Sequence, residues 1–226
     1  MKKELMIYFY TPIAYIVITV FLAVTGFFFF KDFFYFNQAE MRGFFQFLPL
    51  ILTLVVPAIT MRLFAEEIHS GTIENLMTLP VTTMEVVTGK FLAATAFVSI
   101  MLAPTLVYLA TIIFVGSPDP GPVIGGYAGA VLLAGTYSSV GILASSLGRN
   151  QIVAFIIGLA ACFFLWLVDK ITIFLPARLG FLEYLGTDYH FRNISRGVID
   201  SRDVIYFLSI ILVCIFLTTK ILDDRR

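Results

Sequence analysis

The amino-acid sequence predicts an all-α integral membrane protein with six transmembrane helices. Of its 226 residues, 59% are hydrophobic and only 13% are charged, whereas a soluble domain is about half apolar and about a quarter charged. The mean hydropathy is +0.95. The apolar residues form runs close to the roughly 20 residues that a helix needs to cross a bilayer. We expect one membrane domain over residues 1–226, with spans at about 12–30, 44–61, 87–115, 123–147, 152–168 and 204–222.

The N-terminal residues 2–10 predict a short elbow helix that lies in the membrane interface. They mix charged residues with aromatic and aliphatic ones, a composition typical of headgroup depth. Thr11-Pro12 then supplies an N-cap and a first helical residue for span one. The basic start is similar to a signal peptide, but the apolar run continues to Phe30 and no small-x-small cleavage site follows. We therefore expect a retained membrane helix.

Prolines and small residues distinguish the middle spans. Pro57 should kink span two where it leaves the membrane, and Pro104 lies in the middle of span three. Span four contains a line of small residues, which lets helix backbones approach closely in lipid. This line is equally consistent with an interface to a second subunit and with packing inside one chain. Its members are Gly125, Gly129, Ala130, Ala134 and Ser138.

The segment 171–203, between spans five and six, predicts short helices rather than a loop in water. It is polar overall, but it carries apolar pieces that would otherwise be exposed to solvent. We expect these helices to cap the external end of a pathway through the bundle. The candidate residues of this external gate region are Phe174, Phe181, Tyr189, His190 and Phe191.

The polar interruption between spans two and three, residues 61–91, predicts a short amphipathic helix between two stiff turns. Ser70-Gly71 ends the preceding helix, Thr72 can cap the short one, and Pro80 ends it. The apolar residues that share one face of this helix are Ile73, Leu76 and Met77.

Span three begins directly after this short helix. Thr82 and Glu85 have the spacing of a capping box. Gly89-Lys90 is the only Gly-Lys pair, but Met84 occupies the position of the first P-loop glycine and Phe91 replaces the Ser or Thr. The chain therefore has no P-loop, and Lys90 is interpreted as an interfacial anchor at the start of a membrane helix.

The ordered motifs of this stretch carry a resemblance to a known family. They are Glu66-Glu67, Ser70-Gly71-Thr72-Ile73-Glu74, Leu79-Pro80-Val81 and Gly89-Lys90-Phe91. The string resembles the cytoplasmic loop of permeases from the type-2, exporter-like class of ABC transporters. It departs from the family at Ile68-His69-Ser70, where a basic residue is usual.

The resemblance implies that the short helix is a coupling helix, which docks into a groove on a separate ATPase subunit. The residues that it assigns to ATPase docking are Glu66, Glu67, Gly71, Thr72, Ile73, Glu74, Leu76, Met77, Leu79 and Pro80.

Motifs at both ends of the chain extend the resemblance to a branch of this class, the gliding-motility permeases. They are Tyr8-Phe9-Tyr10-Thr11-Pro12-Ile13-Ala14-Tyr15, Tyr189-His190-Phe191, Ser195-Arg196-Gly197-Val198-Ile199-Asp200 and Arg202-Asp203-Val204-Ile205-Tyr206-Phe207. The resemblance implies a half-transporter that pairs with itself or with a sister permease, above two ATPase subunits. A periplasmic or envelope auxiliary protein is a further candidate partner, and the branch does not specify the transported substrate.

Other classes of function lack support in the sequence. The six apolar cores contain no Asp, Glu, Lys, Arg or His, whereas ion-coupled carriers need ionisable groups of this kind along their pathway. No catalytic motif or metal-spaced Cys/His set is present, and zero net charge gives no indication of nucleic-acid binding. Both histidines, His69 and His190, are expected in loops as ordinary polar contacts, and Cys162 and Cys214 as buried hydrophobes. We therefore expect no enzyme activity and no cofactor in this chain, since ATP and Mg²⁺ would be bound by the partner ATPase.

The function expected from these observations is the membrane subunit of an ATP-driven exporter in the bacterial inner membrane. The alternative is a non-transporting membrane anchor of the same class, which passes mechanical force to an envelope partner. An even number of spans places both termini on one side, and the Lys and Arg residues of the short loops favour the cytoplasm.

Overall fold

The computed structural model describes residues 2–36, 40–73, 81–116, 118–172 and 183–224. Within these ranges the chain is helical, with turns and no strand. Six helical segments are long and apolar enough to cross a membrane, which confirms the predicted number of spans. They are Pro12–Tyr35, Arg42–His69, Thr83–Val115, Pro120–Leu147, Gln151–Ile171 and Ser201–Asp223.

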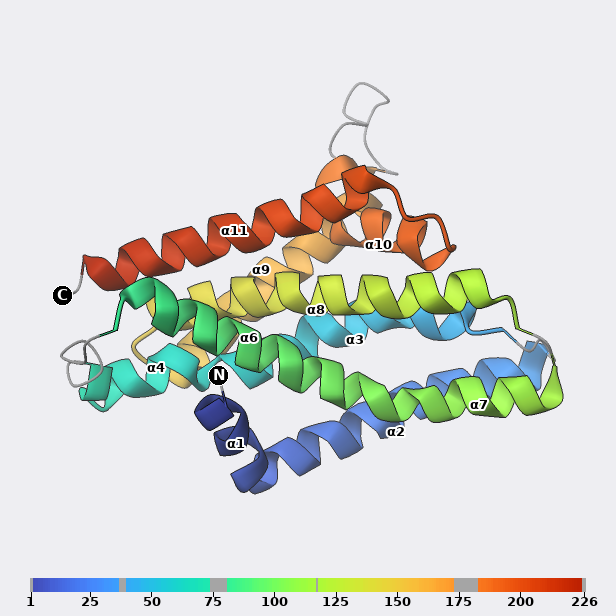
Figure 1. Cartoon of the computed structure of the whole chain (residues 1–226), viewed down its shortest axis with the longest axis horizontal. Helices are drawn as coiled ribbons and strands as arrows, with labels where there is room; N and C mark the ends of the chain where they lie inside the picture. Colours follow the sequence, from blue (N-terminus) through green and yellow to red (C-terminus); the bar gives the residue numbers. More distant parts are fainter. Residues whose placement is uncertain (1, 37–39, 74–80, 117, 173–182, 225–226) are drawn as a thin grey trace.

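The spans form an antiparallel bundle (Figure 1). The end of α4, the start of α6 and the end of α11 lie at one end of it, and the start of α8 lies at the other. The elements in order are α1 (Lys2–Tyr10), α2 (Pro12–Phe36), α3 (Arg42–Thr60), α4 (Arg62–His69), α6 (Thr83–Leu102), η1 (Ala103–Thr105), α7 (Leu106–Val115), α8 (Pro120–Leu147), α9 (Gln151–Ile171), α10 (Thr187–Ser195) and α11 (Ser201–Asp223).

Helix α8 is the central element, because it packs against α3, α4, α6, α9, α10 and α11. Its small residues make these contacts possible. A Cβ added at Gly125 would lie 2.2 Å from the carbonyl oxygen of Ile194 in α10, and one at Gly126 would lie 2.3 Å from the ring of Phe45 in α3. Gly129, Ala130, Ala134 and Ser138 are buried as well. The line of small residues therefore serves packing inside the chain, which is one of the two interpretations that the sequence left open.

The second and third spans are interrupted helices. Span two continues through Pro57 and breaks at Met61, which separates α3 from α4. Span three passes through the 3₁₀ turn η1 around Pro104, because a proline removes one backbone donor from the helical ladder. The connection between the first two predicted spans, 12–30 and 44–61, is shorter than expected, since α2 continues to Phe36 and α3 begins at Arg42.

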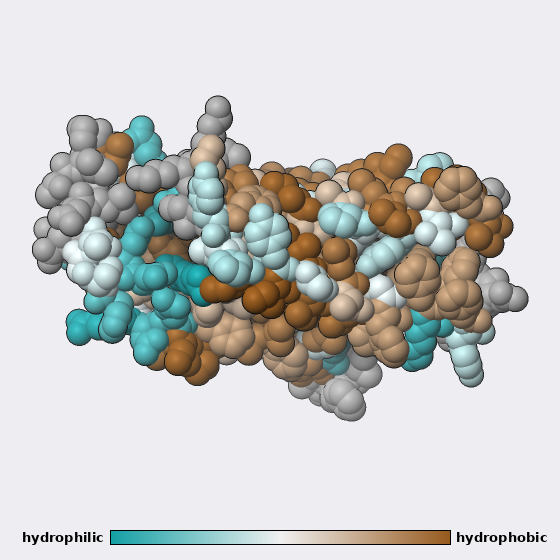
Figure 2. Space-filling view, turned by 90° about the horizontal axis from the view of Figure 1, so that it is seen from below, coloured by the Kyte–Doolittle hydropathy of each residue, from teal (hydrophilic) through white to brown (hydrophobic). Residues whose placement is uncertain are grey.

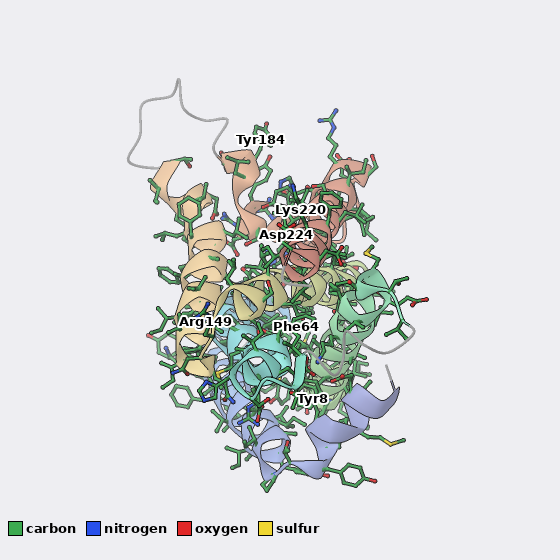
Figure 3. The ribbon with its side chains drawn as sticks, turned by 90° about the vertical axis from the view of Figure 1, so that its left-hand side faces the viewer. Tyr8, Phe64, Arg149, Tyr184, Lys220 and Asp224 are labelled. Atoms are coloured by element: carbon green, nitrogen blue, oxygen red, sulfur yellow. The ribbon has the colours of Figure 1, made fainter. Side chains whose placement is uncertain are left out.

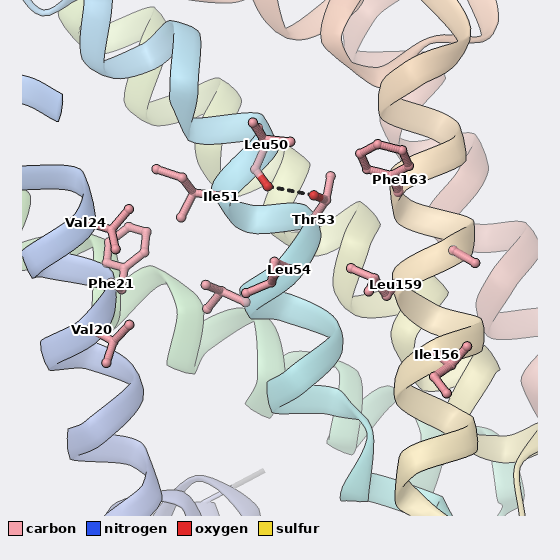
Figure 4. Close-up of a pocket in the computed structure, with 12 residues that line it drawn as sticks. Val20, Phe21, Val24, Leu50, Ile51, Thr53, Leu54, Ile156, Leu159 and Phe163 are labelled. Carbon is pink, nitrogen blue, oxygen red and sulfur yellow. Dashed lines mark hydrogen bonds between the residues drawn. The ribbon is translucent and has the colours of Figure 1, made fainter.

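The outer surface matches a position in lipid. Figure 2 shows an apolar surface across the middle of the molecule, with hydrophilic residues gathered at the end that holds α4. Figure 4 shows an apolar groove of about 670 Å³ between α2 and α9, with α3 at its base. Thr53 is the polar residue of its lining, and its hydroxyl donates to the carbonyl of Leu50 at 2.6 Å within the same helix. Because the one polar side chain of the groove is already hydrogen-bonded inside its own helix, the groove can face lipid.

Candidate functional site

A buried lysine lies at the end of the bundle from which the polar segment 70–82 leaves. The side chain of Lys90 is 3% exposed. Its Nζ lies 2.6 Å from Glu67 Oε1, 2.8 Å from the carbonyl oxygen of Leu63 and 3.5 Å from Glu4 Oε1. It also lies 5.0 Å from the centre of the Phe64 ring, within the range of a cation–π contact. We call this set of contacts the Lys90 cluster; it joins α6 to α4 and α1.

The interpretation of Lys90 as an interfacial anchor is wrong. An anchor extends its ammonium group towards water and headgroups, whereas this one points into the protein and has a carboxylate, a carbonyl and a ring as neighbours. A buried cation is tolerated only where it is paired and hydrogen-bonded. The cluster meets this requirement with the carboxylate of Glu67 and the carbonyl of Leu63, both from α4.

The start of α6 fixes the position of Lys90. The side chain of Thr82 accepts from the amide of Glu85 at 3.3 Å, and Glu85 Oε2 accepts from the amide of Thr82 at 2.9 Å. The predicted capping box is therefore confirmed. The hydroxyl of Thr83 donates to Asp223 at the end of α11, which ties this helix end to the last span.

Helix α4 is held by a serine of α8. Ser145 Oγ accepts from the amides of Phe64 and Ala65, both at 3.0 Å, and donates to the carbonyl of Met61 at 2.9 Å. Met61 separates α4 from α3, and Ser145 gives two amides in the first turn of α4 a hydrogen-bond partner on α8. This contact aims α4, and with it Glu67, at Lys90.

Helix α1 completes the cluster from the N-terminal side. The Tyr8 ring stacks on Phe97 of α6 with 4.8 Å between ring centres, and its hydroxyl donates to the carbonyl of Ile59 at 3.3 Å. Burial raises the pKa of Tyr8, and the nearby Glu4 carboxylate raises it further, so the hydroxyl stays protonated and remains a donor. Figure 3 views the bundle from this end, with Phe64 on α4 and Tyr8 on α1.

A polar cavity of about 320 Å³ lies beside the cluster. It is bounded by α1, α4 and α6, so its shape depends on how these three elements sit together. Its lining residues are Glu4, Tyr8, Thr11, Arg62, Leu63, Glu66, Glu67 and Lys90.

The predicted docking residues of α4 and the following turn separate into two groups. Glu66 is exposed, whereas Glu67 turns inward to Lys90. Gly71 has a φ of +71°, which ends α4 as predicted and favours glycine. The exposed Thr72 Oγ1 lies 2.9 Å from Ser70 Oγ, and Ile73 packs against the cluster of buried residues around Phe64. Glu74, Leu76, Met77, Leu79 and Pro80 lie outside the described residues.

Three of the residues predicted for an external gate, Tyr189, His190 and Phe191, lie in α10. Phe191 is buried against Gly129, His190 is buried and Tyr189 is half-buried. Phe174 and Phe181 lie outside the described residues. The expectation that both histidines lie in loops is wrong, since His69 ends α4 and His190 lies within α10.

A network of charged side chains surrounds this gate region. Asp169 accepts from Arg192 Nη2 at 2.5 Å, and Asp188 lies 2.6 Å from Lys170 Nζ and 3.1 Å from Arg192 Nε. These groups sit at the ends of α9 and in α10, beyond the apolar cores that the sequence defines. They fasten α10 to α9.

Sequence reasoning missed several residues of the site. Lys90 was assigned to the surface, while Glu4 and Ser145 had no role. A signal for Lys90 existed, because Glu67 and Lys90 are opposite charges that flank one loop close to the ends of two neighbouring spans. No comparable signal marks Ser145, which is one of several small residues in span four.

Comparison with known proteins identifies the family of the chain. Residues 7–180 match the model of the family described as ABC-2 family transporter protein. The match covers α2 to α9, including every element of the Lys90 cluster apart from the first residues of α1. No curated protein matches the chain. The matched region is more than half of the sequence, so this multi-pass membrane protein belongs to the ABC-2 transporter family, whose permeases work with an ABC ATPase.

Proposed function

We propose that the chain is the membrane-spanning subunit of an ATP-driven ABC exporter of the bacterial inner membrane, near the gliding-motility branch. Two ATPase subunits would supply the energy, and a second permease, either the same chain or a sister, would complete the pathway. Both termini and the segment 70–82 would face the cytoplasm, where the ATPase is. ATP and Mg²⁺ would be held by that partner, and this chain would perform no catalysis.

The observation that supports this proposal best is the Lys90 cluster. The segment 70–82 is flanked by α4 and α6, and the 2.6 Å contact between Glu67 and Lys90 fastens these two helices to each other. A force applied to the segment therefore moves α4 and α6 together instead of spreading them. The contact of Lys90 with Glu4 brings α1 into the same unit.

The motion would then reach the rest of the bundle through α8. Ser145 fixes α4 on α8 at the same end, and buried apolar residues of α4, α6, α8 and α11 form one cluster there. Because packed helices move as rigid elements, displacement at the polar segment becomes displacement of whole spans. This is the mechanical requirement of a subunit that receives energy from outside the membrane.

The proposal is tested at the predicted coupling helix with Leu76→Asp. If Leu76 inserts into a groove of the ATPase, the variant removes an apolar anchor and places an unpaired charge at the contact. Loss of one interface hot spot costs about 2 kcal/mol or more, roughly thirtyfold in affinity. The variant should insert into the membrane normally but lose its ATPase during purification.

Asn75→Asp is the matched control, because it adds the same charge at a neighbouring position outside the predicted apolar face. It should retain the ATPase. If Leu76→Asp purifies with a full complement of ATPase and stimulates its hydrolysis normally, this segment does not couple the two proteins.

A further inference from the structure

The imidazole of His190 lies between two hydrogen-bond acceptors. Its Nδ1 is 2.6 Å from Asp203 Oδ1 at the start of α11, and its Nε2 is 2.9 Å from the carbonyl oxygen of Tyr184. The ring also stacks on Tyr206 of α11, with 3.9 Å between ring centres. The side chains of His190 and Asp203 are 7% and 4% exposed, so water does not replace these partners.

This geometry needs one proton more than a neutral imidazole beside a carboxylate provides. A neutral imidazole has one N–H and one lone pair. With the proton on Nδ1, the lone pair of Nε2 faces the Tyr184 carbonyl; with the proton on Nε2, the lone pair of Nδ1 faces the Asp203 carboxylate. Both hydrogen bonds form together only if the ring is doubly protonated, or if Asp203 is protonated and donates to Nδ1.

The surrounding charges favour the same state. The network around α10 holds the carboxylates of Asp169, Asp188 and Asp203 and the cations of Lys170 and Arg192. One additional proton on the His190–Asp203 pair therefore makes the groups that these ion pairs join neutral as a set. Neutrality matters here, because Asp169 and Asp203 are buried and each has one carboxylate oxygen without a partner among the described residues.

We propose that His190 and Asp203 form a proton-dependent clamp between α10 and α11. While the extra proton is present, the ring joins Asp203 of α11 to the backbone that leads into α10. When the proton leaves as the pH rises, one of the two hydrogen bonds turns into a repulsion between lone pairs. The ring then releases either Asp203 of α11 or the Tyr184 carbonyl before α10, and the clamp opens at that contact. The proton belongs to the pair as a coupled unit and not to either residue alone.

Other titratable and charged groups pack around this clamp from each neighbouring element. Tyr206 bonds to the carbonyl of Leu185 at 2.6 Å, and Tyr137 of α8 lies 3.0 Å from Thr187 Oγ1. These groups are Asp169 and Lys170 of α9, Glu183 and Tyr184 before α10, Asp188, Tyr189 and Arg192 of α10, Tyr206 of α11 and Tyr137 of α8.

The clamp would give the end of the molecule remote from the Lys90 cluster a sensitivity to acidity. In the orientation proposed above, that end faces outward, so a fall in external pH would hold α10 closed on α11. This direction rests on the proposed function, whereas the clamp rests on the geometry alone. An experiment on the purified chain in detergent therefore tests the clamp even if the exporter assignment fails.

The experiment combines ¹⁵N NMR of histidine with hydrogen exchange. The chain has two histidines, so ¹⁵N-histidine labelling gives two imidazole signals, and a His69→Gln sample assigns them. Both ring nitrogens of His190 should report N–H, or Nε2 alone if Asp203 carries the proton. As the pH rises and this state is lost, amide exchange in α10 should accelerate in parallel, while exchange in α8 stays unchanged.

Asp203→Asn separates the clamp from other effects of pH. An asparagine amide donates to Nδ1 of a neutral ring, whose Nε2–H still donates to Tyr184, so both bonds persist without the extra proton. Exchange of α10 in this variant should be slow at every pH. His190→Gln should instead show fast exchange at every pH, because glutamine cannot donate at both ends.

Three results would overturn the clamp. The first is a neutral His190 beside ionised Asp203 with unchanged α10 exchange. The second is a pH-dependent opening that survives in Asp203→Asn. The third is a His190–Asp203 pair that keeps its proton up to the pH at which the whole protein unfolds.

Discussion

At the residue scale, adjacent glutamates of α4 perform different tasks. Glu66 is exposed at the surface, whereas Glu67 binds the buried Lys90. The family resemblance assigns both to ATPase docking, but the geometry gives Glu67 an internal contact as well. A charge pair of this kind is valuable for position more than for stability, since its Coulomb energy largely offsets the cost of removing both charges from water.

Removing one member of the pair should therefore harm the protein more than removing both. Lys90→Met leaves Glu67 without its cation, and Glu67→Gln leaves a buried cation with a weaker partner. Breaking a buried pair costs about 3–5 kcal/mol; because Glu67 is 28% exposed, we expect about 3 kcal/mol or less for each single variant. The double variant should lower the free energy of unfolding by less than the two single variants do in sum. Unfolding of the purified chain in detergent measures this.

Glu66→Gln is the control for this cycle, and as a surface change it should alter stability by about 0.5 kcal/mol or less. Additive effects of the two single variants would mean that the 2.6 Å contact carries no coupling. The single variants should also reduce stimulation of the ATPase, because α4 and α6 would no longer move as one unit.

At the element scale, the sequence predicted those features that depend on neighbouring residues in the chain. The spans followed from the length and apolarity of the runs, and the start of α6 followed from the spacing of Thr82 and Glu85. Contacts between distant segments were out of reach. The burial of Lys90 depends on α4 and α1 meeting α6, and the burial of His190 depends on α10 packing against α8 and α11. The periodicity of apolar residues within one helix does not show which distant helices pack against it.

The packing of α10 on α8 gives a prediction at this scale. A Cβ at Gly125 would lie 2.2 Å from a backbone carbonyl of α10, which cannot move aside as a flexible side chain would. Gly125→Ala should destabilise the protein by about 1–3 kcal/mol through overpacking. Thermal unfolding in detergent measures this, and α10 amides should exchange faster.

Gly121→Ala is the matched control in the same helix, because beyond its two chain neighbours the Cβ would meet Asp119 Oδ1 at an ordinary 3.5 Å. It should cost less than Gly125→Ala: alanine favours a helix over glycine by up to about 1 kcal/mol, while Pro122 disfavours the helical conformation of an alanine before it. Equal losses in the two variants would mean that α10 does not depend on close approach to α8.

At the scale of the whole molecule, α8 connects two polar networks at different depths. Ser145, near its end, holds α4 beside the Lys90 cluster. Tyr137 lies 3.0 Å from Thr187 at the start of α10, and Gly125 supports the end of α10. Between these networks the helix is packed mainly through small and apolar residues. A change at one polar network can therefore reach the other only through movement of packed helices, which is the behaviour expected of a permease driven from outside the membrane.

The direction of that movement depends on which end faces the cytoplasm, and labelling of single cysteines decides it. Ser70 directly follows α4 and Gly116 directly follows α7, and both residues are exposed. The ends of these two helices lie at opposite ends of the bundle (Figure 1). The native Cys162 and Cys214 are buried and can be replaced by alanine. In spheroplasts, an impermeant maleimide should label Gly116→Cys at once, and Ser70→Cys only after the membrane is permeabilised. The expectation follows from the six spans and from the proposal that the segment 70–82 reaches an ATPase in the cytoplasm. The reverse pattern would place the Lys90 cluster outside and exclude ATPase docking there, and immediate labelling of both positions would contradict the six-span topology itself.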